Sequence, residues 1–84
     1  MIKVYSKPGC TQCVATVARL TARGFEKGKD FEYLDITKDE TAEVEARTFG
    51  IRSMPIVVIG SSENDRWGGF NPDRIDAIPH RVSA

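Results

Sequence analysis

Residues 8–13 of this chain read Pro-Gly-Cys-Thr-Gln-Cys, and this stretch decides the fold. It follows a short alternation of apolar and polar residues at positions 2–5, which predicts a strand. The residues Cys13, Val17 and Leu20 have the spacing of one helix face, and the Pro-Gly pair is typical of a turn. The sequence therefore predicts a Cys-x-x-Cys pair at a strand-to-helix junction.

The two cysteines differ in their position on the predicted helix. The first turn of a helix leaves backbone N–H groups without intrahelical partners and carries about +0.5 charge. Both effects stabilise a thiolate at Cys10, so we expect its pKa to lie below the free value of about 8.5. Cys13 lies one turn deeper, on the apolar face. We interpret Cys10 as a nucleophilic thiol and Cys13 as the thiol that resolves it, with Lys7 near enough in sequence to add positive potential.

Four neighbours of the pair have weaker signals. Thr11 and Gln12, between the cysteines, are expected to tune the pKa and the redox potential mainly through backbone geometry. Tyr5 is interpreted as a packing residue, and Asp35, at the end of the next predicted strand, as a solvated carboxylate.

The composition describes a small protein without a charge imbalance. We expect a single domain over residues 1–84, since 40% hydrophobic and 29% charged residues are ordinary for globular proteins. Twelve basic and twelve acidic side chains leave no net charge, which argues against a nucleic acid or membrane partner. No apolar run approaches the ~20 residues of a membrane span, and the N-terminus lacks a signal-peptide pattern. We expect a cytoplasmic protein, and a monomer.

The residues after the cysteines complete a strand–helix–strand unit. The helix is predicted over residues 11–23 and ends at Gly24, which suits a left-handed conformation. Residues 31–36 are rich in aromatic and branched side chains and predict a second strand. The two strands of such a unit are parallel.

A second helix is predicted immediately after that strand. Thr37 and Glu40 have the spacing of a capping box, so the helix is expected to start there and to run to about Phe49. Ala42, Ala46 and Phe49 would form its inner face.

The last third of the chain predicts two strands and a helix. The apolar run at 56–59 indicates a buried strand, and residues 66–67 a short edge strand. Asn71 followed by proline and aspartate is a helix start, and Pro79 ends that helix. The predicted order is β-α-β-α-β-β-α.

Three interpretations of the cysteine pair stay open from the residues alone. A dithiol–disulfide oxidoreductase is favoured, because Cys-x-x-Cys after the first strand of such a unit is typical of thioredoxin-like proteins. A metal site is the second interpretation: a zinc site would need further ligands, but the chain has no other cysteine, and its one histidine, His80, follows Pro79. A soft-metal carrier also has Cys-x-x-Cys after a first strand, but it would not need Met54-Pro55 or the Asn71-Pro72 helix start. The third is a non-catalytic subunit that uses the fold only as a surface.

Residues 2–78 resemble the glutaredoxin-like NrdH-redoxins. The resemblance rests on Lys7-Pro8-x-Cys10-x-Gln12-Cys13, on Met54-Pro55, and on residues 67–75, which are close to the family pattern Trp-Ser-Gly-Phe-Arg-Pro-Asp. It implies an α/β protein with a minimal thioredoxin fold, in which three helices flank a four-stranded mixed sheet. It also implies a redoxin that needs no bound cofactor or metal, accepts electrons from thioredoxin reductase and delivers them to class Ib ribonucleotide reductase.

The resemblance further implies which residues contact substrate or partner. A cis Met54–Pro55 bond beside the dithiol would leave the backbone of Met54 free to pair with an extended segment. Trp67 and Phe70 are interpreted as an exposed docking patch rather than as edge-of-core packing. The full predicted contact set is Lys7, Thr11, Gln12, Met54, Pro55, Trp67, Gly68, Gly69 and Phe70.

Two departures from the family pattern bear on function. Gly68 replaces a serine and Asn71 an arginine, so hydrogen bonds that brace this loop in relatives are absent or rearranged. Glutathione-using glutaredoxins typically have a polar residue and an aspartate where this chain has Phe70 and Asn71. A glutathione-dependent glutaredoxin is therefore the alternative within the oxidoreductase class.

Overall fold

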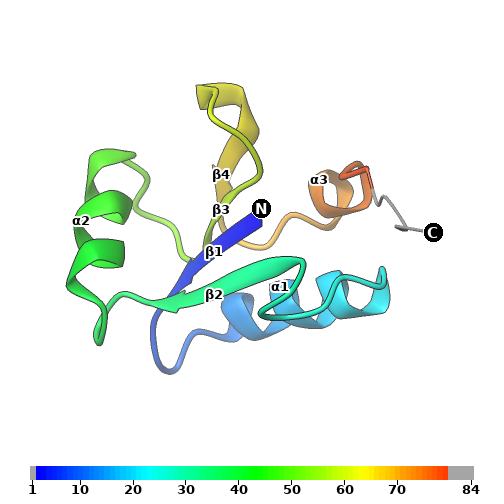
Figure 1. Cartoon of the computed structure of the whole chain (residues 1–84), viewed down its shortest axis with the longest axis horizontal. Helices are drawn as coiled ribbons and strands as arrows, with labels where there is room; N and C mark the ends of the chain where they lie inside the picture. Colours follow the sequence, from blue (N-terminus) through cyan, green and yellow to red (C-terminus); the bar gives the residue numbers. More distant parts are fainter. Residues whose placement is uncertain (1, 80–84) are drawn as a thin grey trace.

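The computed structural model describes residues 2–79 and contains one four-stranded sheet with the strand order β2-β1-β3-β4 (Figure 1). His80, considered from the sequence only as a possible metal ligand, lies outside the described residues. The elements are β1 (Ile2–Ser6), α1 (Thr11–Ala22), β2 (Phe31–Asp35), α2 (Glu40–Thr48), β3 (Ile56–Val58), a 3-10 turn (Glu63–Asp65), β4 (Arg66–Gly68) and α3 (Pro72–Asp76). This order confirms the predicted β-α-β-α-β-β-α arrangement.

The sheet is mixed, as predicted. Strand β1 pairs in parallel with β2 and antiparallel with β3, and β4 pairs antiparallel with β3. Because β1 lies inside the sheet, its C-terminal end at Ser6 delivers the following cysteine loop to the middle of one sheet edge.

Helices cover both faces of the sheet (Figure 1). Alternate strand residues point to opposite faces: Val4, Val57 and Trp67 pack with the α1 and α3 side chains, including Leu20 and Ile75. On the other face, strand residues such as Tyr5 and Ile56 pack against the alanines of α2. Leu20 and Ile75 have no exposed surface. Burial of each contributes about 1.5–3 kcal/mol, which holds α1 and α3 on the sheet.

Most predicted helix signals are confirmed. Gly24 has φ +91° directly after α1. Asn71 caps α3, because its side-chain oxygen accepts a hydrogen bond from the Arg74 N–H at 3.1 Å. The predicted Thr37 cap of α2 is wrong: the carboxylate of Asp39 accepts from the Ala42 N–H instead, at 3.1 Å.

The misplaced cap has a local cause. The Asp35 carboxylate accepts hydrogen bonds from both the backbone N–H and the hydroxyl of Thr37, at 2.8 and 2.6 Å. These bonds lower the pKa of Asp35 and hold Thr37 in the turn before the helix. The Thr37 hydroxyl is therefore engaged two residues before Asp39 caps α2.

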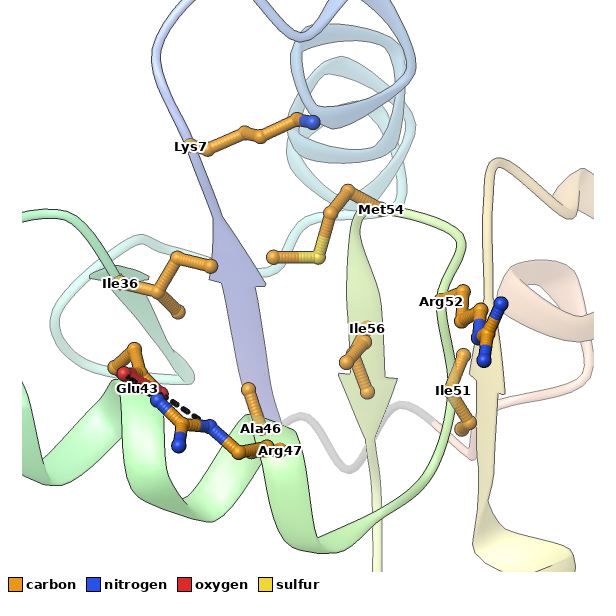
Figure 2. Close-up of a pocket in the computed structure, with 9 residues that line it drawn as sticks. All are labelled: Lys7, Ile36, Glu43, Ala46, Arg47, Ile51, Arg52, Met54 and Ile56. Carbon is orange, nitrogen blue, oxygen red and sulfur yellow. Dashed lines mark hydrogen bonds and ion pairs between the residues drawn. The ribbon is translucent and has the colours of Figure 1, made fainter.

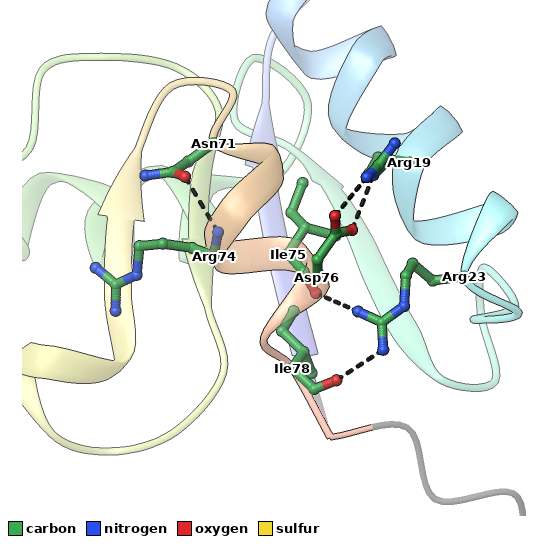
Figure 3. Close-up of polar contacts among 7 residues, drawn as sticks. All are labelled: Arg19, Arg23, Asn71, Arg74, Ile75, Asp76 and Ile78. Atoms are coloured by element: carbon green, nitrogen blue, oxygen red, sulfur yellow. Dashed lines mark hydrogen bonds and ion pairs between the residues drawn. The ribbon is translucent and has the colours of Figure 1, made fainter.

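Polar contacts join α1 to α3 (Figure 3). The Arg23 guanidinium donates to the carbonyl oxygens of Ile75 and Ile78, at 2.7 and 3.1 Å. Arg19 forms a two-point ion pair with Asp76, in which Nε lies 2.9 Å from Oδ1. The short α3 helix is thus held at its C-terminal end by Arg19 of α1 and by Arg23, the residue that follows α1 as its C-cap.

The Arg19–Asp76 pair predicts a pH-dependent contribution to stability. Hydrogen bonding and charge from Arg19 lower the pKa of Asp76. A carboxyl whose folded-state pKa is depressed stabilises the fold above its unfolded pKa, and that contribution disappears as the pH falls through the folded-state value. We expect Asp76→Asn to lower the urea midpoint at pH 7, and the difference from the parent protein to shrink below about pH 4.

Urea denaturation of the parent and variant at pH 7 and pH 3 measures this effect. Arg19→Gln should reproduce the loss at pH 7, and the double variant should lose little more, because both changes break one interaction. A difference that is equally large at both pH values would contradict this assignment.

Within residues 2–79, no helix is both long enough and apolar enough to cross a lipid bilayer.

Candidate active site

The dithiol lies at the N-terminal end of α1. Cys10 is the N-cap residue, with extended backbone angles, and its sulfur accepts a hydrogen bond from the Cys13 N–H at 3.1 Å. The two Cα atoms are 5.2 Å apart and the side chains form a disulfide. Cys10 is partly exposed, whereas Cys13 has no exposed surface. Only Cys10 can therefore be reached by a disulfide on another molecule.

The charges around Cys10 favour an anion. No acidic residue lies in the first turn of α1, so nothing there offsets the positive end of the helix dipole. The hydrogen bond from the Cys13 N–H is of the kind that stabilises a thiolate when the disulfide is reduced. Lys7, three residues before Cys10, is exposed and adds a positive charge to the same loop. Tyr5 and Asp35, on the neighbouring strands, take other partners.

Tyr5 is a packing residue, as predicted. Its ring is 1% exposed and meets the Phe49 ring edge-on, with centroids 5.6 Å apart. Its hydroxyl donates to Glu45 at 2.9 Å, and burial together with this carboxylate raises the pKa of Tyr5. The tyrosine thus ties β1 to α2 and does not face the disulfide.

A cis peptide bond joins Met54 to Pro55, as the resemblance implied. The carbonyl oxygen of buried Pro55 accepts from the Gly69 N–H at 2.8 Å. Within residues 2–79, neither the N–H nor the carbonyl of Met54 takes part in a hydrogen bond. The backbone of this residue is therefore available to a bound segment.

Gln12 reaches across the site with its side chain. Its amide oxygen accepts a hydrogen bond from the Phe70 N–H at 2.9 Å, although the two residues are 58 positions apart. The expectation that Gln12 acts mainly through backbone geometry missed this contact. Thr11, in contrast, is exposed, with no side-chain hydrogen bond within residues 2–79.

Of the two residues predicted to form an exposed docking patch, Phe70 is exposed and Trp67 is buried. Trp67 is only 6% exposed and packs in the core between sheet and α3, with the Arg74 guanidinium 4.6 Å from its ring centre. It is on β4, whose inner face is covered by α3, so its ring cannot meet a partner. Phe70 lies beyond the strand and is 37% exposed.

Comparison with known proteins agrees with this geometry. The glutaredoxin family model matches residues 2–62. The Escherichia coli (strain K12) glutaredoxin-like protein NrdH is 35% identical over 86 aligned residues, covering 99% of this chain and 98% of the relative. This chain belongs to the glutaredoxin family. It is an NrdH-like redoxin, a thiol–disulfide oxidoreductase whose Cys10–Cys13 pair is the redox centre.

A solved structure and one further relative extend the comparison. A solved structure of the E. coli NrdH-redoxin superposes with a TM-score of 0.76 at 32% identity, covering 95% of this chain and 97% of that chain. The gene 56 protein of Mycobacterium phage L5 is 30% identical over 78 residues, 92% of this chain and 70% of that protein. The thioredoxin-like fold is thus shared over nearly the whole redoxin.

A groove of about 320 Å³ runs beside the cis-proline of this redoxin, between α2 and the sheet (Figure 2). Its apolar walls come from α2, from the segment before β3 and from the strand ends, and include Ile36, Met54 and Ile56. Lys7 and Arg52 also line it, and within residues 2–79 neither takes part in an ion pair. The groove therefore offers apolar surface and positive charge next to Met54.

The redoxin shows no preformed metal cluster in its described part: residues 2–79 contain no group of three or more His, Cys, Asp or Glu side chains placed to hold an ion.

Sequence reasoning missed a steric feature of the redoxin beside Met54. A Cβ atom at Gly68 would overlap the Ile51 methyl group and would lie 2.8 Å from the Ser53 carbonyl oxygen. Gly68 thus lets the segment before the cis-proline lie directly against β4. The sequence signal was the glycine that replaces the family's serine.

Proposed function

We propose that this redoxin is a cytoplasmic monomer that passes electron pairs from thioredoxin reductase to a class Ib ribonucleotide reductase. The reduced Cys10 thiolate attacks one sulfur of the target disulfide, forms a mixed disulfide and displaces the other sulfur as a thiolate. The Cys13 thiolate then attacks the Cys10 sulfur, which releases the second target thiolate and leaves the Cys10–Cys13 disulfide. Two electrons have passed to the target, and protons return to its two thiolates.

The observation that carries the mechanism is the unequal exposure of two sulfurs at one helix start. The accessible sulfur, Cys10, also receives the Cys13 N–H and the positive end of α1, so it is suited to be the attacking thiolate. Cys13 has no exposed surface, and its sulfur is bonded to that of Cys10. This arrangement supports attack from outside at Cys10 and resolution from inside by Cys13.

The binding of an extended target segment follows from the surroundings of Met54. Its unpaired backbone N–H and carbonyl can accept a strand from the target, a mode in which main-chain hydrogen bonds supply affinity. The adjoining groove can take side chains of that strand, and Phe70 provides an apolar contact on the β4–α3 turn.

The choice of electron donor is supported by two observations. The structure of the E. coli NrdH-redoxin is described as explaining a thioredoxin-like activity profile of a glutaredoxin-like protein. In this chain the Phe70 N–H is already taken by Gln12, and the following Asn71 side chain caps α3. Neither group is therefore free to hold glutathione. The name NrdH of the relatives supports ribonucleotide reductase as the acceptor.

The proposal predicts which reductase supports turnover. NADPH oxidation is followed during reduction of a model disulfide, with either thioredoxin reductase or glutathione plus glutathione reductase. We expect turnover with thioredoxin reductase and a rate at least about 10-fold lower with glutathione, a difference of about 1.4 kcal/mol in the barrier. Turnover with glutathione alone would instead identify a glutathione-dependent glutaredoxin. Reduction of an oxidised class Ib ribonucleotide reductase by the redoxin then tests the acceptor.

A further inference from the structure

We propose that Gln12 is a specificity-determining residue, because its side chain holds the Gly69–Phe70 turn in the position that a protein partner meets. The proposal rests on the docking role of Phe70 in the proposed function. Gln12 lies inside the Cys-x-x-Cys motif, but it acts on the binding of the partner and not on the reactivity of the two sulfurs.

The turn is held from two sides. On one side the Gly69 N–H donates to the Pro55 carbonyl at 2.8 Å, which ties the turn to the cis-proline. On the other side the Phe70 N–H donates to the Gln12 amide oxygen at 2.9 Å, which ties the turn to the dithiol helix. The two successive N–H groups thus join the turn to both other segments of the active site.

Gly69 makes this approach possible. Its φ of +84° is in the left-handed region, and a Cβ there would lie 3.0 Å from the Gln12 oxygen. The Gln12 side chain therefore crosses the open side of a glycine, where most other residues would crowd it. Its starting point is fixed as well, because the Gln12 carbonyl accepts from the buried Thr16 hydroxyl at 2.8 Å.

The contact fixes the backbone of a partly exposed aromatic residue, Phe70, against the first turn of the dithiol helix. The bond from the Gly69 N–H to Pro55 holds the residue before Phe70, and the Asn71 cap holds the residue after it, so Gln12 supplies the restraint on the Phe70 backbone itself. Without that restraint, a partner must order Phe70 on binding, which weakens association. A small disulfide that reaches Cys10 without touching Phe70 is not affected in this way.

The test compares Gln12→Met with Gln12→Glu, using dithiothreitol as the electron donor. Methionine matches glutamine in length but lacks the acceptor oxygen, whereas glutamate keeps it. For each variant, kcat/KM is measured for the insulin disulfides and for 2-hydroxyethyl disulfide, and the ratio of the two is compared. A change in the reactivity of the thiol affects both substrates alike, so it cancels in the ratio of the two kcat/KM values.

We expect Gln12→Met to lower the insulin to small-disulfide ratio about 5- to 10-fold, mainly through KM, and to speed hydrogen exchange of the Phe70 amide by a similar factor. In Gln12→Glu, which keeps an acceptor oxygen, the ratio and the exchange rate of the Phe70 amide should both stay close to the parent values. An unchanged ratio, or an unchanged Phe70 amide, would overturn the proposal. Because neither thioredoxin reductase nor ribonucleotide reductase enters this assay, a failure of the proposed electron route would leave its result unaffected.

Discussion

The Cys10→Ser variant is expected to lose disulfide-reductase activity by at least about 1,000-fold, because exchange requires a thiolate and a serine hydroxyl does not ionise in this pH range. The loss should be equally large with protein and with small disulfides, since Cys13 has no exposed surface from which to replace Cys10. Activity retained by Cys10→Ser would show that the roles of the two cysteines are reversed or that the pair is not the reacting centre.

The matched variant Cys13→Ser separates the two steps. It should still attack a target disulfide through Cys10 but should stop at the mixed disulfide, because the resolving thiolate is missing. Mass spectrometry of the non-reduced adduct, followed by peptide mapping, identifies the linked sulfur. An adduct through Cys10 fits the assignment, and the absence of any adduct contradicts it.

The fold and the dithiol were predictable because their signals are local. The strand before the cysteines, the helix after them and the Asn71-Pro72 start of α3 are each specified by a few adjacent residues. Even the unequal exposure of Cys10 and Cys13 follows from helix periodicity. The wrong cap at Thr37 shows the limit of such local signals. Both Thr37 and Asp39 could cap α2, and the Thr37 hydroxyl instead donates to the Asp35 carboxylate, which leaves the cap to Asp39.

The rest of the site depends on contacts between distant segments. The sequence shows an aromatic pair at 67 and 70, but only the sheet pairing of β4 and the position of α3 put Trp67 in the core and Phe70 outside. Likewise, the Gln12 contact with Phe70 requires both segments to be in place, and no local pattern encodes a hydrogen bond over 58 positions. Tertiary packing therefore determines which of the predicted contact residues can meet a partner.

Gly68→Ala is expected to destabilise the redoxin by about 1–3 kcal/mol and to lower its activity, although it adds a single methyl group. The backbone at Gly68 is not in the left-handed region, so alanine is compatible with its φ value. The cost comes from space: the new Cβ overlaps the Ile51 methyl and lies 2.8 Å from the Ser53 carbonyl oxygen, which is backbone and cannot rotate away. Relief requires the segment before Met54 to move, and with it the site for the target strand.

Gly60→Ala is the matched control. Its Cβ would meet only the side chain of Asp65, which can rotate away at the loss of the exposed 3.3 Å hydrogen bond that it accepts from the Ser62 N–H, and Gly60 also lies outside the left-handed region. We expect a loss of less than about 1 kcal/mol there. Urea denaturation gives the free energy of unfolding of each variant, and the insulin assay under conditions where both are folded gives the activity. Equal losses for the two variants would mean that the contact of Gly68 with the cis-proline segment has no special importance, whereas a larger loss at Gly68 shows that this glycine keeps the segment, and so Met54, against β4.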